Sequence, residues 1–319
     1  MNSLDNNYGD TTDSRGFVAE SLYAISDAHR AQIGSFLALL DHRDGTFPLS
    51  DQAMVDFNNF PRAKLAALLF YATSTPNDLL AYAQVTSPGD ESSIEFAIHP
   101  ALRHNDDLFS LIVRSASNEA LAQSARSVTL WMTEPYHHLS KTITSLGFHL
   151  DRSVVQLKIA LPLAPHFKDE IKGFTTRTFK PGIDEAAWLA LNARAFRDHP
   201  EQGAWSAEDI AARETLPWFD PNSFLIAESH GQLAGACWIK IHYDVSPEIG
   251  EIYVISVDPS YQGLGLGKAL TISGLRWLET HQIDQAMLYV DAHNERALSL
   301  YRSIGFREFA SRSVYRLAG

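Results

Sequence analysis

The chain has little cysteine, a deficit of positive charge and no long apolar run. Cys237 is its only cysteine, which excludes an intrachain disulfide and a metal site built from several thiolates. Because this residue lies in an apolar stretch, we expect an inert thiol inside a core. Lys and Arg number 26 against 38 Asp and Glu, a net charge of −12. Such a charge disfavours binding to nucleic acid and to anionic membranes.

Membrane and secretion signals are also missing from the sequence. No apolar stretch approaches the ~20 residues of a membrane helix, and residues 1–16 have neither a basic start nor an apolar signal core. We therefore predict a cytoplasmic protein, and we expect a monomer. Hydrophobic residues make up 45 % and charged residues 20 % of the chain, as in ordinary globular proteins. Its 319 residues correspond to about two domains of roughly 150 residues each.

An internal repeat supports this division. Three short segments recur 158 or 159 residues later: Ser145–Phe148 as Ser303–Phe306, Ile98–Pro100 as Val257–Pro259, and Leu130–Met132 as Leu288–Val290. Such self-similarity predicts two copies of one domain in tandem. We place the first domain at residues 16–159, a proline-punctuated linker at 160–172 and the second domain at 173–319.

The second half alternates strand and helix patterns. We expect strands at 224–228, 233–242, 250–257 and 286–290, helices at 265–280 and 294–303, and strand-like segments at 306–317. Asn294 is a suitable N-cap for the last helix. Antiparallel hairpins followed by strand, helix, strand and helix predict an α/β domain with a mixed sheet.

A glycine-rich turn joins the strand that ends at Val257 to the helix that follows it. Gly263, Gly265 and Gly267 let backbone N–H groups point into one concavity, where the helix N-terminus favours a phosphate. Lys268 would add a cation. A tight turn without a ligand is the alternative. The segment is not a Walker loop, because Lys268 is followed by Ala269, and it fits the Rossmann pattern poorly.

Two motifs together resemble a known family. Gln262-x-x-Gly265-x-Gly267, and the run from Asn294 through Tyr301 to Gly305-Phe306, are similar to the acetyl-CoA-binding core of GNAT N-acetyltransferases. Further segments narrow the likeness to the mycothiol synthase family, whose chains are tandem GNAT proteins: Phe196–Trp205, Trp238-x-Lys240, Gly250–Val254 and Leu288–Val290. The resemblance covers residues 173–319 well and the first half faintly, which implies two tandem GNAT domains with a degenerate first copy.

The resemblance implies transfer of acetyl from acetyl-CoA to the cysteinyl amine of cysteinyl-glucosaminyl-inositol, the last step of mycothiol biosynthesis. Acetyl-CoA would be held by Ile255, Ser256, Val257, Gln262, Gly263, Leu264, Gly265, Leu266, Gly267, Lys268, Asn294, Glu295, Arg296, Ala297, Leu298 and Ser299. The thiol sugar would contact Asp44, Glu201, Lys240, Glu251 and Tyr289.

The chemistry assigns roles to two of these positions. An α-amino group with a pKa near ~7.7–8.0 is partly protonated at neutral pH, so a base must take its proton. Glu251, on the strand before the turn, is our candidate, directly or through water; the alternative is a solvated strand residue. The family pattern favours Tyr301 as the acid that protonates the leaving thiolate. Its alternative is a core aromatic residue, and Tyr289 could exchange roles with it.

The remaining charged positions carry weaker signals. Lys240, Glu201 and Asp44 would orient a hydroxyl-rich substrate through charge-assisted hydrogen bonds, although each alone is typical of a solvated surface charge. His137 and His138 are adjacent and have no carboxylate at ligand spacing, so we expect no metal site.

The first half lacks the predicted chemistry. At the repeat offset, Gly265 corresponds to Asp106, Tyr301 to Ile143, Asn294 to Tyr136 and Glu251 to Ser92. A carboxylate would repel a phosphate, and the missing glycine removes backbone freedom. We therefore predict one active site, in the second domain. Two alternatives stay open for its function: a GNAT enzyme that acetylates another amine, and a non-catalytic acyl-CoA sensor.

Overall fold

The computed structural model describes residues 11–13, 16–44, 47–58, 65–87, 90–133, 136–170, 172–197, 202–243 and 245–317. The chain forms two compact units. The first comprises Met1–Val154 together with Ser311–Gly319, and the second comprises Val155–Ala310. The end of the chain belongs to the first unit because Arg312–Leu317 pair antiparallel with Val128–Thr133.

The first unit is a mixed sheet with helices. Its elements are β1 (Thr11–Asp13), β2 (Phe17–Leu22), α1 (Asp27–Asp44), α2 (Asp51–Asn58), β3 (Leu65–Ala72), β4 (Thr75–Thr86), β5 (Glu91–Ile98), α3 (Asp106–Ala122), β6 (Ser127–Thr133) and α4 (Ser140–Ser145). Strands β1 to β5 are joined by antiparallel pairing in chain order, and β6 lies parallel to β5.

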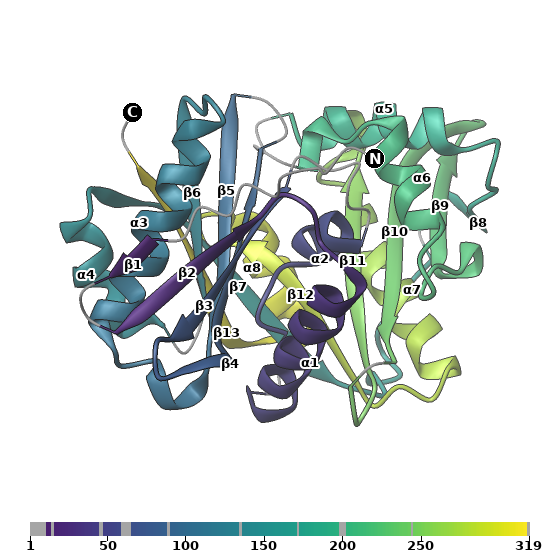
Figure 1. The fold of residues 1–319 in the computed structure, drawn as a ribbon. Helices are drawn as coiled ribbons and strands as arrows, with labels where there is room; N and C mark the ends of the chain where they lie inside the picture. Colours follow the sequence, from purple (N-terminus) through teal and green to yellow (C-terminus); the bar gives the residue numbers. More distant parts are fainter. Residues whose placement is uncertain are drawn as a thin grey trace. The chain divides into compact units, whose positions relative to one another are not determined.

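The second unit repeats this order. Its elements are β8 (Thr175–Thr178), α5 (Glu185–Ala195), α6 (Ala207–Glu214), β9 (Phe224–Ser229), β10 (Gln232–His242), β11 (Ile249–Val257), α7 (Leu266–Thr280), β12 (Gln285–Asp291) and α8 (Glu295–Ile304). The strands β7 (Phe148–Ala160) and β13 (Arg307–Leu317) each have residues in both units. Strands β8 to β11 pair antiparallel in sequence, and β12 lies parallel to β11. Figure 1 traces these elements along the chain. The strands and helices predicted for this half are confirmed, with bounds that differ by one residue at most ends.

The repeated sequence segments mark repeated local structures. Gly147 follows α4 and Gly305 follows α8, with φ angles of 94° and 117°. This left-handed conformation ends a helix and suits glycine. His99 and Asp258 each accept a hydrogen bond from the backbone N–H two residues later, at the start of a 3₁₀ turn after β5 and after β11. The repeat therefore preserves the turns that join strands to helices.

Two hydrophobic cores lie on opposite faces of the strands of the second unit. One core packs α7 and α8 against β10, β11 and β12, and it contains the buried Cys237. The other is aromatic, built around Trp188 of α5 and Trp238 of β10. Because β10 and β11 contribute alternate residues to both cores, the sheet has two chemically different faces.

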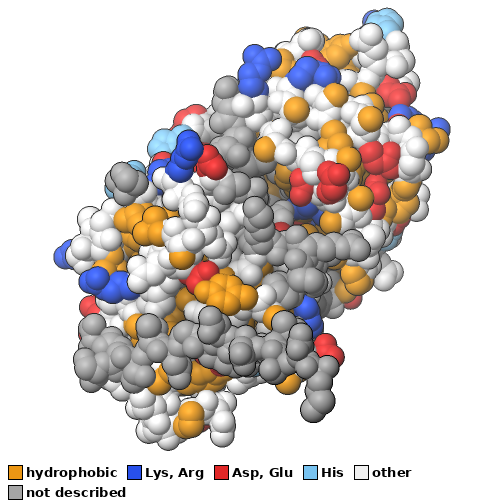
Figure 2. Space-filling view, turned by 45° about the horizontal axis from the view of Figure 1, so that its top comes forward, with side chains coloured by type: hydrophobic (Ala, Val, Ile, Leu, Met, Phe, Trp, Pro, Cys, Tyr) orange, Lys and Arg blue, Asp and Glu red, His pale blue; other side chains and the backbone are white. Residues whose placement is uncertain are grey.

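The face drawn in Figure 2 carries charged side chains of both signs. Figure 2 shows Lys and Arg side chains in small separate groups among acidic and neutral side chains on the face drawn. Among the described residues, no helix is long and apolar enough to cross a membrane.

Candidate active site

The turn between β11 and α7 leaves the start of α7 accessible to an anion. Gly263 and Gly265 have φ angles of 82° and 86°, which glycine adopts without steric cost. Gly265 is the N-cap of α7, where no described side chain caps the helix and no acidic residue occupies the first turn. The N–H groups at such a helix start carry partial positive charge and are suited to bind phosphate.

Side-chain contacts connect this turn to α8. The Arg296 guanidinium donates to the Gln262 side-chain oxygen at 2.8 Å, and Lys268 Nζ donates to Ser303 Oγ at 3.1 Å. Asn294 caps α8, as predicted, because its side-chain oxygen accepts from the Ala297 N–H at 3.1 Å. The Arg296 contact joins the turn to the start of α8, and the Lys268 contact joins the first turn of α7 to the end of α8.

The residues expected to hold acetyl-CoA therefore lie in three segments. They occupy the end of β11 (Ile255, Ser256, Val257), the turn and first turn of α7 (Gln262, Gly263, Leu264, Gly265, Leu266, Gly267, Lys268), and the start of α8 (Glu295, Arg296, Ala297, Leu298, Ser299) after its cap Asn294. Most of the turn is exposed, whereas Ser256 is buried.

Strands β11 and β12 pair over a short stretch only. Their described parallel pairing covers Gly250 with Ala286 and Glu251 with Met287, although β11 continues to Val257 and β12 to Asp291. The register of β11 against β10 shifts at Tyr253, an extra residue opposite Trp238 and Ile239. Such a bulge bends a strand and ends regular pairing. Backbone groups beyond Glu251 can then serve a ligand.

Glu251 lies at the point where this pairing ends. It is directly opposite Lys240 of β10, so the two side chains share a face of the sheet. Both residues are 7 % exposed. Glu251 Oε2 is 2.7 Å from His242 Nε2. A buried carboxylate with this partner is a group that can exchange a proton.

Lys240 is surrounded by aromatic rings. Its Nζ lies 4.9 Å from the centroid of Trp218 and 5.7 Å from that of Tyr253, distances at which ring faces attract a cation. The Tyr253 hydroxyl also accepts a hydrogen bond from Nε of the buried Arg213 at 2.8 Å. Two cations thus contact the aromatic core, and one of them, Lys240, lies opposite Glu251.

The two tyrosines of interest differ in environment. Tyr301 lies in the core beneath α7 and is 7 % exposed. Burial raises the pKa of its hydroxyl well above the usual value, so the group stays protonated at neutral pH and can donate a proton. The half-buried Tyr289 of β12 accepts a hydrogen bond from the Gln156 side chain at 3.0 Å.

The remaining predicted positions have partners or lie outside the described residues. Asp44, in the first unit, accepts two hydrogen bonds from the Arg103 guanidinium, at 2.9 and 2.5 Å, so a substrate would share its carboxylate. Glu201 is outside the described residues. His137 Nε2 and His138 Nε2 lie 3.3 and 3.0 Å from backbone carbonyl oxygens.

Comparison with known proteins decides the family. A model of the acetyltransferase (GNAT) family matches residues 187–306. The chain is 38 % identical over 310 residues to the mycothiol acetyltransferase of Streptomyces avermitilis, covering 94 % of this chain and 96 % of that one. It is 37 % identical over 276 residues to the mycothiol acetyltransferase of Thermobispora bispora, covering 86 % and 90 %. The chain belongs to the mycothiol acetyltransferase family.

Solved structures agree with this fold. The structure of a GCN5-related N-acetyltransferase from Sphaerobacter thermophilus has a TM-score of 0.72 at 21 % identity and covers 96 % of both chains. A tandem GNAT protein from the clavulanic acid biosynthesis pathway has a TM-score of 0.72 at 15 % identity, covering 95 % of this chain and 99 % of that one. This mycothiol acetyltransferase family member is thus a mixed α/β protein with the tandem GNAT fold, and the resemblance found in its sequence is confirmed.

In this family member a side chain caps the helix α3 of the first unit, whereas no described side chain caps α7 of the second unit. The side chain of Asn105 caps α3 by accepting from the Leu108 N–H at 2.9 Å, and Asp106 and Asp107 occupy the first turn. The Tyr136 hydroxyl, buried in the core, accepts from the Ile98 N–H at 2.9 Å. In the first unit, side chains of the protein therefore bond backbone N–H groups at the start of α3 and at the end of β5.

One sequence correspondence is wrong. The repeat offset aligns Glu251 with Ser92, whereas pairing shows that Ser93 is its counterpart. Ser93 lies opposite Thr86 of β4 and Thr129 of β6, just as Glu251 lies opposite Lys240 and Met287. The physical reason is the bulge in β11, which adds one residue between this position and the end of the strand.

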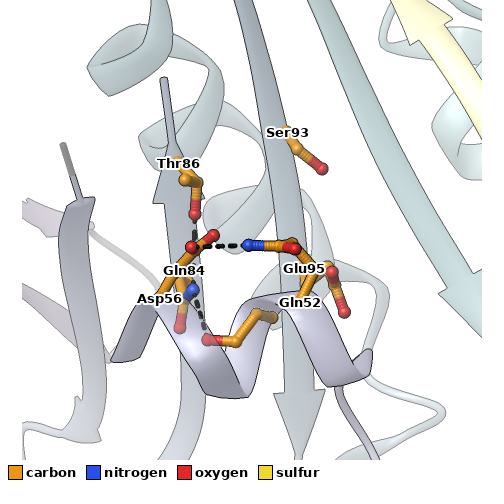
Figure 3. A pocket seen from close by; sticks show the side chains of 7 residues that line it. Gln52, Asp56, Gln84, Thr86, Ser93 and Glu95 are labelled. Carbon is orange, nitrogen blue, oxygen red and sulfur yellow. Dashed lines mark hydrogen bonds between the residues drawn. The ribbon is translucent and has the colours of Figure 1, made fainter. Parts of the chain in front are cut away.

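In the first unit, the region that corresponds to Glu251 contains a small cavity between hydrogen-bonded side chains. A pocket of about 40 Å³ lies there, lined by side chains of α2, β4 and β5 (Figure 3). The buried Gln84 donates to the Ala53 carbonyl at 2.9 Å and to Thr86 Oγ1 at 3.3 Å. The Glu95 carboxylate accepts from the backbone N–H and from the hydroxyl of Ser50.

Sequence reasoning missed two residues of the second unit. His242 is two residues after Lys240 on the same strand, so the period-2 alternation of a strand places both on one face. That signal was present in the sequence. Gln156, which contacts Tyr289, lies 133 residues away in the chain, and no local pattern predicts the contact.

Proposed function

We propose that this chain transfers acetyl from acetyl-CoA to the cysteinyl amine of cysteinyl-glucosaminyl-inositol, which yields mycothiol. One observation carries the proposal: a glycine turn before an uncapped helix and a buried carboxylate occur at the two ends of one strand, β11. The first supplies a site for an anionic cofactor and the second a base for an amine. The names of the relatives support the choice of amine.

The residues at the turn fit acetyl-CoA. Its pyrophosphate would lie against the N–H groups at the start of α7, where Lys268 adds positive charge and the first turn of the helix has no acidic residue. Backbone groups of Ile255 to Val257, beyond the last pair with β12, would hold the pantetheine arm. When bound, acetyl-CoA supplies an acetyl group activated as a thioester.

The thiol sugar would bind on the aromatic face of the sheet. Lys240 and Glu251 present opposite charges there, which suit a substrate with many hydroxyls and one ammonium. We include Tyr289, Glu201 and Asp44 among its contacts on the family pattern. In this arrangement Asp44 would bind the substrate while it stays paired with Arg103.

Proton transfers complete the mechanism, because the nitrogen loses two protons and the departing sulfur takes one. Glu251 takes a proton from the ammonium, directly or through a water molecule, and leaves the amine able to attack. Backbone N–H groups near Ile255 would stabilise negative charge on the carbonyl oxygen. Tyr301 donates its hydroxyl proton to the departing sulfur, and the second proton that leaves the nitrogen as the amide forms restores that hydroxyl.

The test is product formation from purified protein. Acetyl-CoA and cysteinyl-glucosaminyl-inositol are mixed with the chain, and the acetylated product is followed by mass, because the substrate itself carries a thiol. Free cysteine, glucosamine, a polyamine and a peptide are tested in parallel. We expect acetylation of the thiol sugar at a rate well above those for the other amines.

Other outcomes assign the two alternative functions. Faster acetylation of a different amine would make the chain a GNAT enzyme of other specificity. Acetyl-CoA binding without turnover of any amine would indicate a sensor. Light scattering of the same preparation checks the predicted monomer.

A further inference from the structure

His242 contacts the predicted base and was not part of the sequence-derived site. Its Nε2 lies 2.7 Å from Glu251 Oε2, within the range of a charge-assisted hydrogen bond. The contact crosses two neighbouring strands, since His242 ends β10 and Glu251 lies in β11. The imidazole therefore adjoins the carboxylate oxygen that would carry the substrate proton.

The two side chains differ in their access to solvent. The Glu251 side chain is 9 % exposed and that of His242 is 20 % exposed. A buried carboxylate that receives a proton in every turnover needs a route by which to lose it. The imidazole is such a route, because it can accept a proton at one nitrogen and release one from the other.

Two cationic side chains of this region, Lys240 and Arg213, have other contacts than His242. Lys240 faces Glu251 directly across the strands and is held between Trp218 and Tyr253. Arg213 reaches this region through the Tyr253 hydroxyl. Lysine and arginine side chains carry hydrogen-bond donors and no acceptor. Among the described side chains with a recorded contact to the Glu251 carboxylate, His242 is the proton acceptor.

We propose that His242 is a proton relay that acts through Glu251 and connects it to solvent; the inference rests on the proposed function. The substrate N–H bond breaks as an O–H bond forms on Glu251. That proton passes to Nε2 of the imidazole while the proton on Nδ1 leaves to water, and proton exchange with solvent returns the ring to its first tautomer. The net transfer is one proton from the ammonium to solvent, and Glu251 is again a carboxylate for the next turnover.

The first unit supports the link between this pair and catalysis. Its counterpart of Glu251 is Ser93, which cannot act as a base at neutral pH. The unit that lacks the open helix start thus also lacks the carboxylate that a relay would serve.

The decisive experiment compares His242→Gln, His242→Ala and a matched control, His149→Gln, an exposed histidine of the first unit. Glutamine retains a hydrogen bond to the carboxylate but cannot carry a proton. We expect both His242 variants to lower kcat with the thiol sugar by about 10- to 100-fold, with the KM for acetyl-CoA within about twofold. Added imidazole should restore much of the rate of His242→Ala, and His149→Gln should match the parent.

The outcomes separate the two hypotheses. Parent protein without turnover of the thiol sugar would refute the proposed function. An active parent with fully active His242 variants would refute the relay alone. A slow His242→Ala that imidazole does not restore, beside an active His242→Gln, would also refute it, because it would show that the side chain only orients Glu251. Acetyl-CoA binding by each variant, measured by calorimetry, confirms that the second unit is folded.

Discussion

Single residues in this protein acquire their chemical character from burial. Cys237 lies fully inside the core between the sheet and α7, and this burial raises the pKa of its thiol to about 12. The expectation of an inert thiol follows, because the reactive form is the thiolate. Burial acts in the same direction on the Tyr301 hydroxyl, and there it keeps available the proton that the proposed mechanism uses.

The raised pKa of Cys237 predicts a pH dependence of stability. The folded protein retains a proton that the unfolded chain loses above its ordinary pKa of 9.0, so the free energy of unfolding falls as the pH rises through this range. Between pH 8 and pH 10 the parent should lose about 1 kcal/mol more than Cys237→Ala. Guanidinium unfolding at the two pH values measures the difference. Equal losses in both proteins would contradict the assignment.

Elements position the site through two departures from regular structure. The bulge at Tyr253 ends the pairing of β11 with β12 near Glu251, and Gly265 starts α7 without a side-chain cap. In the first unit, β5 pairs with β6 over Glu91–Ile94 and α3 is capped by Asn105. The longer strand pairing and the capped helix therefore belong to the first unit, whereas the proposed site lies in the second.

Close packing of α7 on β11 predicts opposite effects of two Gly→Ala changes. A Cβ at Gly274 would lie 2.9 Å from Cys237 Sγ and 2.9 Å from Ile252 Cδ1, whereas a Cβ at Gly34 in α1 would have nothing within 4 Å. Gly34→Ala should stabilise the protein by about 0.5–1 kcal/mol through helix propensity. Gly274→Ala should destabilise it by about 1–3 kcal/mol through overpacking. Denaturant unfolding of both variants gives the comparison, and stabilisation by Gly274→Ala would disprove the close packing.

At the scale of the whole molecule, the two units share one fold, but we expect acetyl-CoA to bind to the second unit alone. The first unit keeps the strand order and the turns of the second, yet its Tyr136 and Asn105 side chains bond the backbone N–H groups of Ile98 and Leu108. We therefore expect the first unit to contribute structure rather than a second acetyl-CoA site.

This difference predicts one acetyl-CoA per chain. Isothermal titration should give a stoichiometry of one, because the first unit offers no open helix start. Gly265→Asp, which places a carboxylate at the start of α7, should abolish binding by like-charge repulsion and backbone strain. Two comparable sites in the parent, or unchanged binding by Gly265→Asp, would contradict the prediction.

The sequence by itself determined the elements of the second unit, the repeat, the family and the segments expected to hold acetyl-CoA. These follow from local signals: the periodicity of apolar residues, the Asn294 cap and the glycines at positive φ. Only the tertiary structure decided that Glu251 contacts His242, that Ser93 is its counterpart, and that Tyr136 bonds the Ile98 N–H. The reason is that these contacts depend on strand register, and a single bulge shifts that register by one residue without leaving a local pattern.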